Sequence, residues 1–134
     1  MGQPAANANC TVVAVDTHIV MVPTPGGPVP TPLPHPFQGM FGSGLAMTVK
    51  ICGAPAVIEG SVANASPPHI PPPPGASFQR PPANRGTASN SGSMTVKIAG
   101  ARAYRVGDPV MTCNDPADVP VGRIVGATTV LIGG

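Results

Sequence analysis

Charged residues are scarce in this sequence, and that scarcity limits the functions open to it. They make up 9 % of the 134 residues, and the formal net charge is only +2. The seven basic residues are dispersed along the chain, so they form no basic run of the kind that binds nucleic acid. We therefore expect no nucleic-acid partner.

Long apolar runs are also missing, and cysteines are few. No apolar run approaches the roughly 18 residues that a membrane-spanning helix requires. The N-terminus lacks the basic and apolar regions of a signal peptide, so we expect no export by the general route. Three cysteines, an odd number, argue against a disulfide scaffold and fit a reducing compartment.

Proline and glycine, by contrast, are abundant, with 20 and 17 residues. Such a level often marks a disordered chain, but an apolar content of 42 % argues against disorder, because disordered chains are normally poor in apolar residues. Scattered proline and glycine also disfavour helices. The composition predicts one all-β domain over residues 1–134, built from short strands and Pro/Gly-rich loops.

An internal repeat supports this expectation. The sequence MTVKI at 47–51 recurs at 94–98, and a looser copy, TVLI, occupies 129–132. Each copy alternates polar and apolar residues, which is the pattern of a half-buried strand. Gly53 and Gly100 follow the first two copies and predict a glycine-containing turn into a returning strand.

The start of the chain matches the start of the second repeat. GQPAA at 2–6 aligns with GAPAV at 53–57, which divides the chain into units of about 2–52, 53–99 and 100–133. The last strand can then lie beside the first segment. The sequence therefore predicts a single chain with a pseudo-three-fold axis.

Every histidine lies in one of the long proline-rich loops of these units. His18 comes 16 residues after Gly2, and His69 comes 16 residues after Gly53, so the two positions are equivalent. Cys113 lies in the matching loop of the third unit, and His35 is an extra histidine in the first. Each histidine alone could be an exposed loop residue, but together three imidazoles and one thiolate form the tetrahedral set that structural zinc favours.

The other two cysteines are weaker candidates. Cys52 aligns with Ala99 and Gly133, which indicates a small packing residue, buried or on the turn, at a strand end. For Cys10 the pattern leaves both readings open, a metal ligand or a core residue.

These motifs resemble the PAAR family. The stretch GARAYRVGD at 100–108 is similar to the PAAR repeat, with partial copies at 4–6 and 55–56, although no copy is complete and Ser61 replaces the usual aspartate. The segments 18–28 and 67–74 resemble the proline-rich PAAR-like variant of the family. The resemblance covers essentially the whole chain.

The resemblance implies a sharp, three-faced β-cone with zinc near its apex. By position, the zinc ligands would be His18, His35, His69 and Cys113. One such tip caps a trimeric, VgrG-like β-helical spike of a type VI secretion system or a related extracellular contractile particle.

Such a tip sharpens the spike for membrane puncture and helps effector delivery. It would occupy the bacterial cytoplasm before assembly and then the spike apex, with transient contact to the target membrane and with effector or adaptor proteins bound separately. No toxin domain is expected after the third strand. The expected spike-facing residues are Val49, Ile51, Val96, Ile98, Val130 and Ile132.

Two other functions compete with this one. A zinc hydrolase needs an open coordination position and a nearby acid or base, whereas four protein ligands leave no position for water and only five residues are acidic. We therefore expect no enzyme. A free-standing zinc-binding structural or adhesive module stays open as the alternative to a spike tip.

Overall fold

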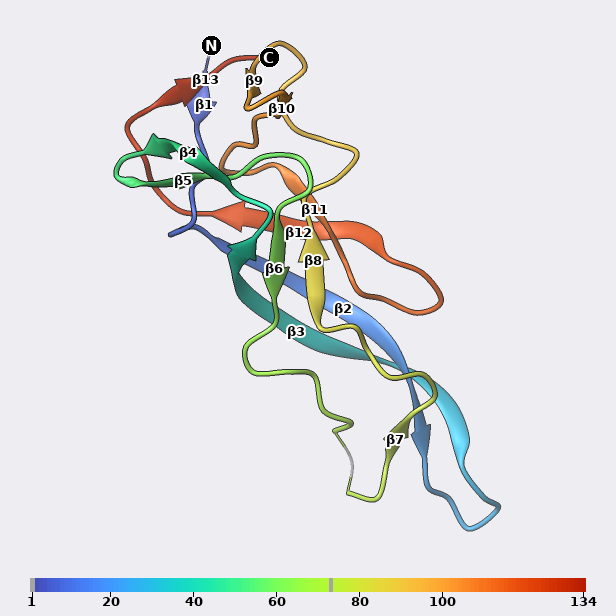
Figure 1. Ribbon diagram of the computed structural model, residues 1–134. Coiled ribbons are helices and arrows are strands. Elements are labelled where there is room, and N and C mark those ends of the chain that lie inside the picture. The colour runs from blue at the N-terminus through green and yellow to red at the C-terminus, as the bar shows by residue number, and fades with distance from the viewer. Residues whose placement is uncertain (1, 73) are drawn as a thin grey trace.

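The computed structural model describes residues 2–72 and 74–134, so Pro73 of the predicted proline-rich loop lies outside the described residues. The chain is elongated, and both termini lie at one end, here called the base (Figure 1). The hairpin of strands β2 and β3 extends to the opposite, distal end. No helix in the described residues is long and apolar enough to cross a membrane.

The described residues form thirteen strands and confirm the predicted all-β class. Most strands are short, as expected where proline and glycine interrupt the chain so often. The strands are β1 Gln3–Pro4, β2 Thr11–Val22, β3 Val29–Ser43, β4 Ala46–Ile51, β5 Ala54–Ala56, β6 Val62–Asn64, β7 Ser77–Phe78, β8 Arg85–Thr87, β9 Lys97–Ile98, β10 Ala101–Arg102, β11 Pro109–Thr112, β12 Val119–Val125 and β13 Leu131–Ile132.

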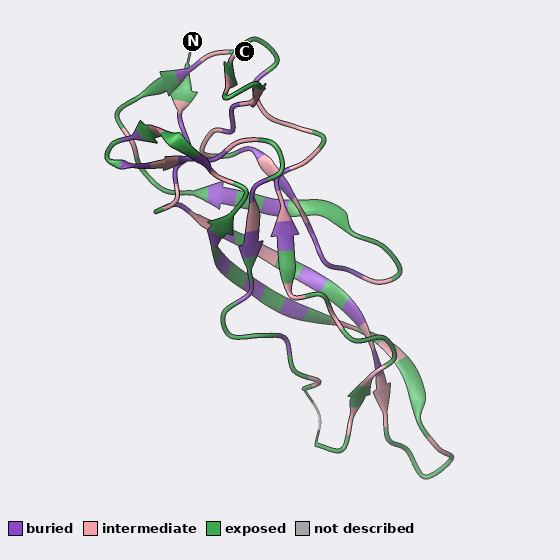
Figure 2. Cartoon of the chain, viewed as in Figure 1, coloured by how far each residue is buried: buried purple, intermediate pink, exposed green. Residues whose placement is uncertain are grey.

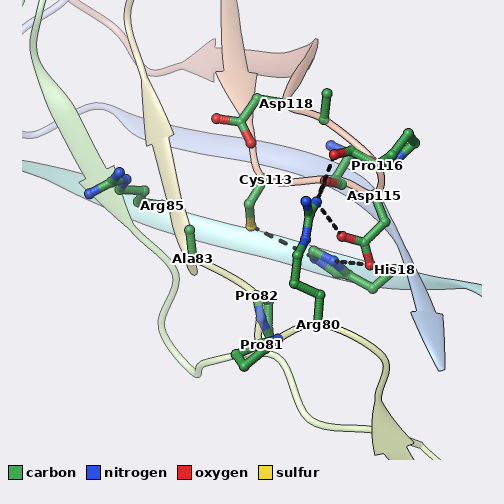
Figure 3. Close-up of a pocket in the computed structure, with 12 residues that line it drawn as sticks. His18, Arg80, Pro81, Pro82, Ala83, Arg85, Cys113, Asp115, Pro116 and Asp118 are labelled. Atoms are coloured by element: carbon green, nitrogen blue, oxygen red, sulfur yellow. Dashed lines mark hydrogen bonds and ion pairs between the residues drawn. The ribbon is translucent and has the colours of Figure 1, made fainter. Parts of the chain in front are cut away.

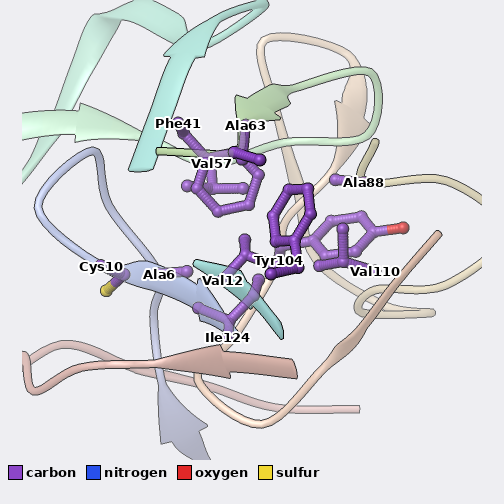
Figure 4. Packing of buried hydrophobic residues seen from close by; sticks show 12 residues of the cluster. Ala6, Cys10, Val12, Phe41, Val57, Ala63, Ala88, Tyr104, Val110 and Ile124 are labelled. Atoms are coloured by element: carbon purple, nitrogen blue, oxygen red, sulfur yellow. The ribbon is translucent and has the colours of Figure 1, made fainter. Parts of the chain in front are cut away.

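Seven of these strands form one sheet in the order β12-β11-β8-β6-β3-β2-β7. An additional pairing of β12 with β2 closes the first six of them into a ring. Buried and exposed residues alternate along β2 and β3 (Figure 2), as the two faces of a half-buried strand require. Inward side chains of the sheet, among them Val12, Phe37, Val110 and Ile124, form the main hydrophobic core together with Tyr104, which lies outside the strands (Figure 4).

The hairpin of β2 and β3 is paired continuously from Thr11 opposite Met40 to Val22 opposite Val29. Prolines recur at every second position of β3 over residues 30–36. A ladder tolerates such prolines when their nitrogens point away from the partner strand. The outer edge of β3 consequently presents few N–H donors, which protects it from pairing with another chain.

At the base, three separate two-stranded ladders occupy equivalent positions of the three sequence units: β4 with β5, β9 with β10, and β13 with β1. In each ladder an isoleucine pairs with the second residue of the following unit. The predicted pairing of the last strand with the first segment is thus confirmed. The pairs are Ile51 with Ala54, Ile98 with Ala101 and Ile132 with Gln3.

Three equivalent backbone hydrogen bonds link the units to one another. The N–H of Ala6 donates to the carbonyl of Tyr104 at 2.9 Å, that of Tyr104 to Val57 at 3.1 Å, and that of Val57 back to Ala6 at 3.1 Å. These bonds close a cycle among residues that the repeat alignment makes equivalent. At these three positions, each unit is therefore bonded to both of the others.

The predicted glycine turns are also present. Cys52 and Gly53 have φ of 51° and 85°, and Ala99 and Gly100 have φ of 52° and 82°. Two successive positive φ values are the mark of a type I′ turn, which joins the strands of a tight hairpin. Cys52 lies on this turn, and its side chain is exposed. Of the two positions expected for it, buried or on the turn, the structure has the second.

Ser61 and Asp108 lie at matching positions of the second and third units and make the same hydrogen bond. Ser61 Oγ accepts a hydrogen bond from the N–H of Ile58 at 3.0 Å. Asp108 Oδ2 accepts the equivalent bond from the N–H of Arg105 at 2.8 Å. Both side chains close the same turn, so the replacement preserves the local structure.

A second, smaller core lies at the base. Ala5, Ala56 and Ala103 are equivalent in the repeat and fully buried, each with 0 % of its surface exposed. Ile51 and Ile132 pack beside them. The small alanine side chains let the three units approach one another closely.

This core changes the interpretation of the strand residues expected to face a spike. Ile51 and Ile132 are buried, and Val49, Val96 and Ile98 pack partly against the base core; of the six, Val130 is exposed, at 40 %. The inward side of these strands is occupied by the molecule's own interior. The large exposed side chains at the base are instead those of Met47, Met94 and Leu131.

Candidate metal centre

The hairpin of β2 and β3 places three polar side chains on one face. Asp16 and His18 are two residues apart on β2 and so point to the same side. His35 lies directly opposite Asp16 in the register, and directly opposed residues of an antiparallel pair share a face. All three side chains are buried, with 0, 1 and 3 % of their surface exposed.

His69 and Cys113 reach the same place from distant parts of the chain. The N–H of His69 donates to Asn84 Oδ1 at 2.9 Å. Cys113 directly follows β11, and its N–H donates to the carbonyl of Arg85 at 3.2 Å. Residues 84 and 85 therefore fix the backbone next to both side chains.

The facing atoms of these side chains have the separations of ligands on one metal ion. His18 Nε2 lies 3.2 Å from His69 Nδ1, and Cys113 Sγ lies 3.8 Å and 3.9 Å from those two nitrogens. Around tetrahedral zinc, two nitrogen ligands lie about 3.3 Å apart, and a nitrogen and a sulfur about 3.6 Å. The three atoms thus fit one face of a zinc tetrahedron within a few tenths of an ångström.

Asp16 completes a buried group of four that could hold a metal ion. One ligand atom from each of Asp16, His18, His69 and Cys113 can be chosen so that all four lie within 4.8 Å of one another. Three of these residues were predicted from the repeat, and Asp16 was not. The signal that could have identified it is its spacing of two residues from His18 on the same strand face.

His35, the fourth predicted ligand, lies beside this group but outside it. Its ring centre is 5.3 Å from that of His18 and 5.5 Å from that of His69. Three imidazoles on one tetrahedral ion have ring centres about 5.2 Å apart. The Nδ1 atom of His35 pairs with the carbonyl of Leu33 at 3.0 Å, while its buried Nε2 makes no hydrogen bond within the described residues.

Two carboxylates lie behind the histidines. Asp16 Oδ2 is 3.6 Å from His69 Nε2, and Asp115 Oδ2 is 3.5 Å from His18 Nδ1, just beyond hydrogen-bond distance. In each case the other ring nitrogen faces the cluster. Metal-bound histidines commonly direct their second nitrogen to a carboxylate, which fixes the ring and raises its basicity.

Asp16 and Asp115 are themselves held in place. Asp16 accepts hydrogen bonds from Thr112 Oγ1 and Asn114 Nδ2. Asp115 accepts one from the N–H of Ile19 at 2.9 Å. Burial opposes ionisation of Asp115, but its hydrogen bonds from Ile19 and Arg80 hold its pKa below the ordinary range. Asp115 is therefore a carboxylate at neutral pH.

Burial also sets the ionisation of the candidate ligands. Burial lowers the pKa of His35 and of His69, so both rings are neutral at pH 7, the form that binds metal. Burial raises the pKa of Cys113 to about 11, which keeps the thiol protonated when no ion is bound. Metal binding requires the thiolate and must therefore release a proton.

Cys10, the residue left open by the sequence, belongs to the hydrophobic core. It is 2 % exposed, packs with Ala6 and Val12 among others, and places its Sγ 3.6 Å from Asn7 Oδ1. It is not part of the buried metal-ligand group. Its role is packing.

Comparisons of this chain with family models, with curated proteins and with solved structures gave no match.

Proposed function

We propose that this chain is a PAAR-type tip that caps a trimeric, VgrG-like spike of a contractile injection system. The observation that carries the proposal is the cycle of equivalent hydrogen bonds among Ala6, Val57 and Tyr104 at the base. A single chain whose three units contact one another equivalently can match a partner with a true three-fold axis. The chain would then be a pseudo-three-fold cone.

The arrangement along the long axis supports the same function. The three base ladders lie at the end with the termini, whereas the hairpin of β2 and β3 extends to the other end (Figure 1). The base would face the spike through exposed side chains such as Met47, Met94 and Leu131. The distal end would then point towards the target cell, consistent with a tip that aids membrane puncture and effector delivery.

We further propose that the buried cluster holds one zinc ion, with His18, His35, His69 and Cys113 as ligands. His35 is the better fourth ligand because its buried Nε2 has no hydrogen-bond partner in the described part of the chain, and an unsatisfied buried nitrogen requires an explanation. Asp16 and Asp115 would act as the outer carboxylates that orient His69 and His18. Zinc in this site would cross-link strands that are distant in sequence.

A closed set of four protein ligands favours a structural over a catalytic role. Catalytic zinc keeps a position for water or substrate, whereas these ligands are all buried. X-ray absorption that reports three nitrogens and one sulfur, with no additional oxygen, is the expected result. If the measurement showed an oxygen in place of one nitrogen, Asp16 rather than His35 would be the fourth ligand.

The decisive experiment measures assembly with a spike trimer. We expect light scattering on the mixture, with a trimeric VgrG-like spike from the organism that encodes this chain, to give one tip per three spike chains. If the chain stays monomeric in the presence of the trimer, its function would instead be that of a free-standing zinc-binding or adhesive module.

Two exposed residues provide a matched pair of variants for this experiment. Met47 at the base and Ile70 in the distal half are 67 % and 73 % exposed, so a charge at either position should leave the fold intact. Met47→Glu should weaken the complex and Ile70→Glu should not. Hydrogen exchange should show protection in β4, β9 and β13 upon binding. Protection confined to the segments around the candidate ligands would contradict the orientation.

A further inference from the structure

A cavity of about 330 Å³ opens beside two of the candidate ligands (Figure 3). Its lining includes His18 and Cys113, which are buried and so form its inner wall. Arg80, Arg85 and Asp118 also line it. The cavity therefore joins the buried cluster to solvent through polar and charged walls.

A second cavity, of about 350 Å³, lies against the other two candidate ligands, His35 and His69. Its remaining walls are Ile70 and prolines, with no charged side chain among them. A divalent ion sheds water at a high free-energy cost unless polar groups replace that water. Of the two cavities, the first is consequently the one suited to passage of an ion.

Arg80 ties the two sides of the first cavity together. Its guanidinium donates to Asp115 Oδ1 at 2.8 Å, to the carbonyl of Pro116 at 2.8 Å and to that of Asn114 at 3.3 Å. These three acceptors follow Cys113 directly in the chain. Arg80 thus holds the segment 114–116, and with it the backbone next to Cys113, against the opposite wall.

The backbone that precedes Arg80 is held in place separately from its guanidinium. The neighbouring strand β7 pairs with β2 at Phe78 opposite Val20. The N–H of Gln79 donates to the carbonyl of Ile19 at 2.9 Å. The side chain of Arg80 is nonetheless 58 % exposed, so it can swing into solvent without unfolding either strand.

We propose that the metal ion enters and leaves through this first cavity and that Arg80 is the latch that controls the exchange. This inference rests on the proposed metal centre. When Arg80 is bound to residues 114–116, its positive charge and its three hydrogen bonds hinder the ion. When Arg80 swings out, segment 114–116 is released, and Cys113 and His18 become accessible from the cavity.

The test compares ion exchange in Arg80→Ala with that in a matched control, Arg123→Ala. Arg123 donates to carbonyls of its own strand and lies outside the cavity lining. Cobalt(II) loading is followed by its visible absorption, and zinc loss by transfer to a chromogenic chelator in excess. We expect Arg80→Ala to accelerate both processes at least about tenfold, the lower range of effects for outer partners of a metal site, and Arg123→Ala to leave them unchanged.

A bulky substitution tests the route by obstructing it, which should slow the exchange. Ala117 lines the first cavity and is exposed, whereas Ile70 lines the second. Ala117→Trp should slow cobalt(II) loading, while Ile70→Trp should leave the rate unchanged. Slower loading in Ile70→Trp alone would move the route to the second cavity and overturn the inference.

The outcomes separate this inference from the metal centre itself. Equal exchange rates in the wild-type chain and Arg80→Ala, with about one ion per chain in both, would refute the latch and leave the proposed centre intact. A wild-type chain that binds neither zinc nor cobalt(II) would refute both. An Arg80→Ala variant that loses thermal stability without faster exchange below its melting temperature would assign Arg80 a purely structural role.

Discussion

The base and the distal half of this molecule are stabilised in different ways. At the base, three equivalent segments pack small side chains, Ala5, Ala56 and Ala103, and exchange backbone hydrogen bonds. In the distal half, one long hairpin and two loops surround a buried group of histidines, carboxylates and a thiol. The base packs apolar side chains against one another, whereas the distal half buries a polar group that could hold a metal ion.

Charged residues are also distributed differently between the two regions. None of the charged residues of the chain lies in segments 19–34 and 66–79, and the described residues of these segments lie towards the far end of the molecule (Figure 1). At the base, by contrast, Arg105 and Asp108 form a hydrogen-bonded ion pair. The far end therefore holds no ion pair between such side chains, whereas the base holds at least one.

The largest effect should come from removing a distal ligand. Cys113→Ala should abolish zinc binding and lower the melting temperature strongly, because structural zinc contributes an apparent ~10–16 kcal/mol in small domains. Cys52→Ala, at an exposed turn of the base, should change neither quantity. Elemental analysis and thermal melts measure both. Equal effects of Cys113→Ala and Cys52→Ala would contradict the predicted dependence of the distal half on a metal ion.

Overpacking of the base should produce a smaller and purely mechanical effect. Ala103 is completely buried among the three units, so Ala103→Leu should lower the free energy of unfolding by about 1–3 kcal/mol. Zinc content should stay at about one per chain, because the ligands lie in the other half. Urea denaturation with parallel metal analysis tests this. Zinc loss in the folded variant would show that the two regions are coupled.

A substitution behind the ligands should have an effect of similar or smaller size. Asp16→Asn should retain zinc but weaken its affinity by about 10–100-fold, the usual range for an outer carboxylate. His35→Ala should instead open the coordination shell to water. Competition with a calibrated chelator gives the affinities. If Asp16→Asn abolished binding and His35→Ala did not, Asp16 would be the fourth ligand.

The smallest effect at neutral pH concerns Tyr104, which belongs to the hydrogen-bond cycle of the base. Burial raises its pKa to about 12, above the ordinary value of about 10 for tyrosine. Its contribution to stability is therefore complete below pH ~10 and is lost as the pH rises towards 12. Because the chain has one tyrosine and no tryptophan, phenolate absorption reports this residue alone. Titration near pH 10 in the folded protein would contradict its burial.

Much of the base was predictable from the sequence. The repeat of MTVKI, its strand period and its following glycine predicted the ladders and turns around Gly53 and Gly100, and the alignment of the first segment predicted the pairing of β1 with β13. These features depend on neighbouring residues and on the repetition itself. The prediction was weaker for side-chain direction, since Ile51 and Ile132 point into the base core.

The candidate metal centre was predictable only in part. Equivalence under the repeat identified His18 and His69, and the matching loop identified Cys113. The position of Asp16 within the group, and of His35 beside it, follows from the register of β2 against β3. A shift of that register by one residue would turn these side chains to the outer face.

The sequence by itself therefore determined the strand class, the hairpin pairings at the base and most of the candidate metal ligands, because period, turn chemistry and repetition are local properties. The tertiary structure decided which side chains converge and how they are held. Asp115 and Cys113 meet His18, and Arg80 meets Asp115, through contacts between segments that lie about 35 to 97 residues apart in the chain. Such contacts are set by how the closed ring of strands pairs and by nothing in the neighbouring sequence.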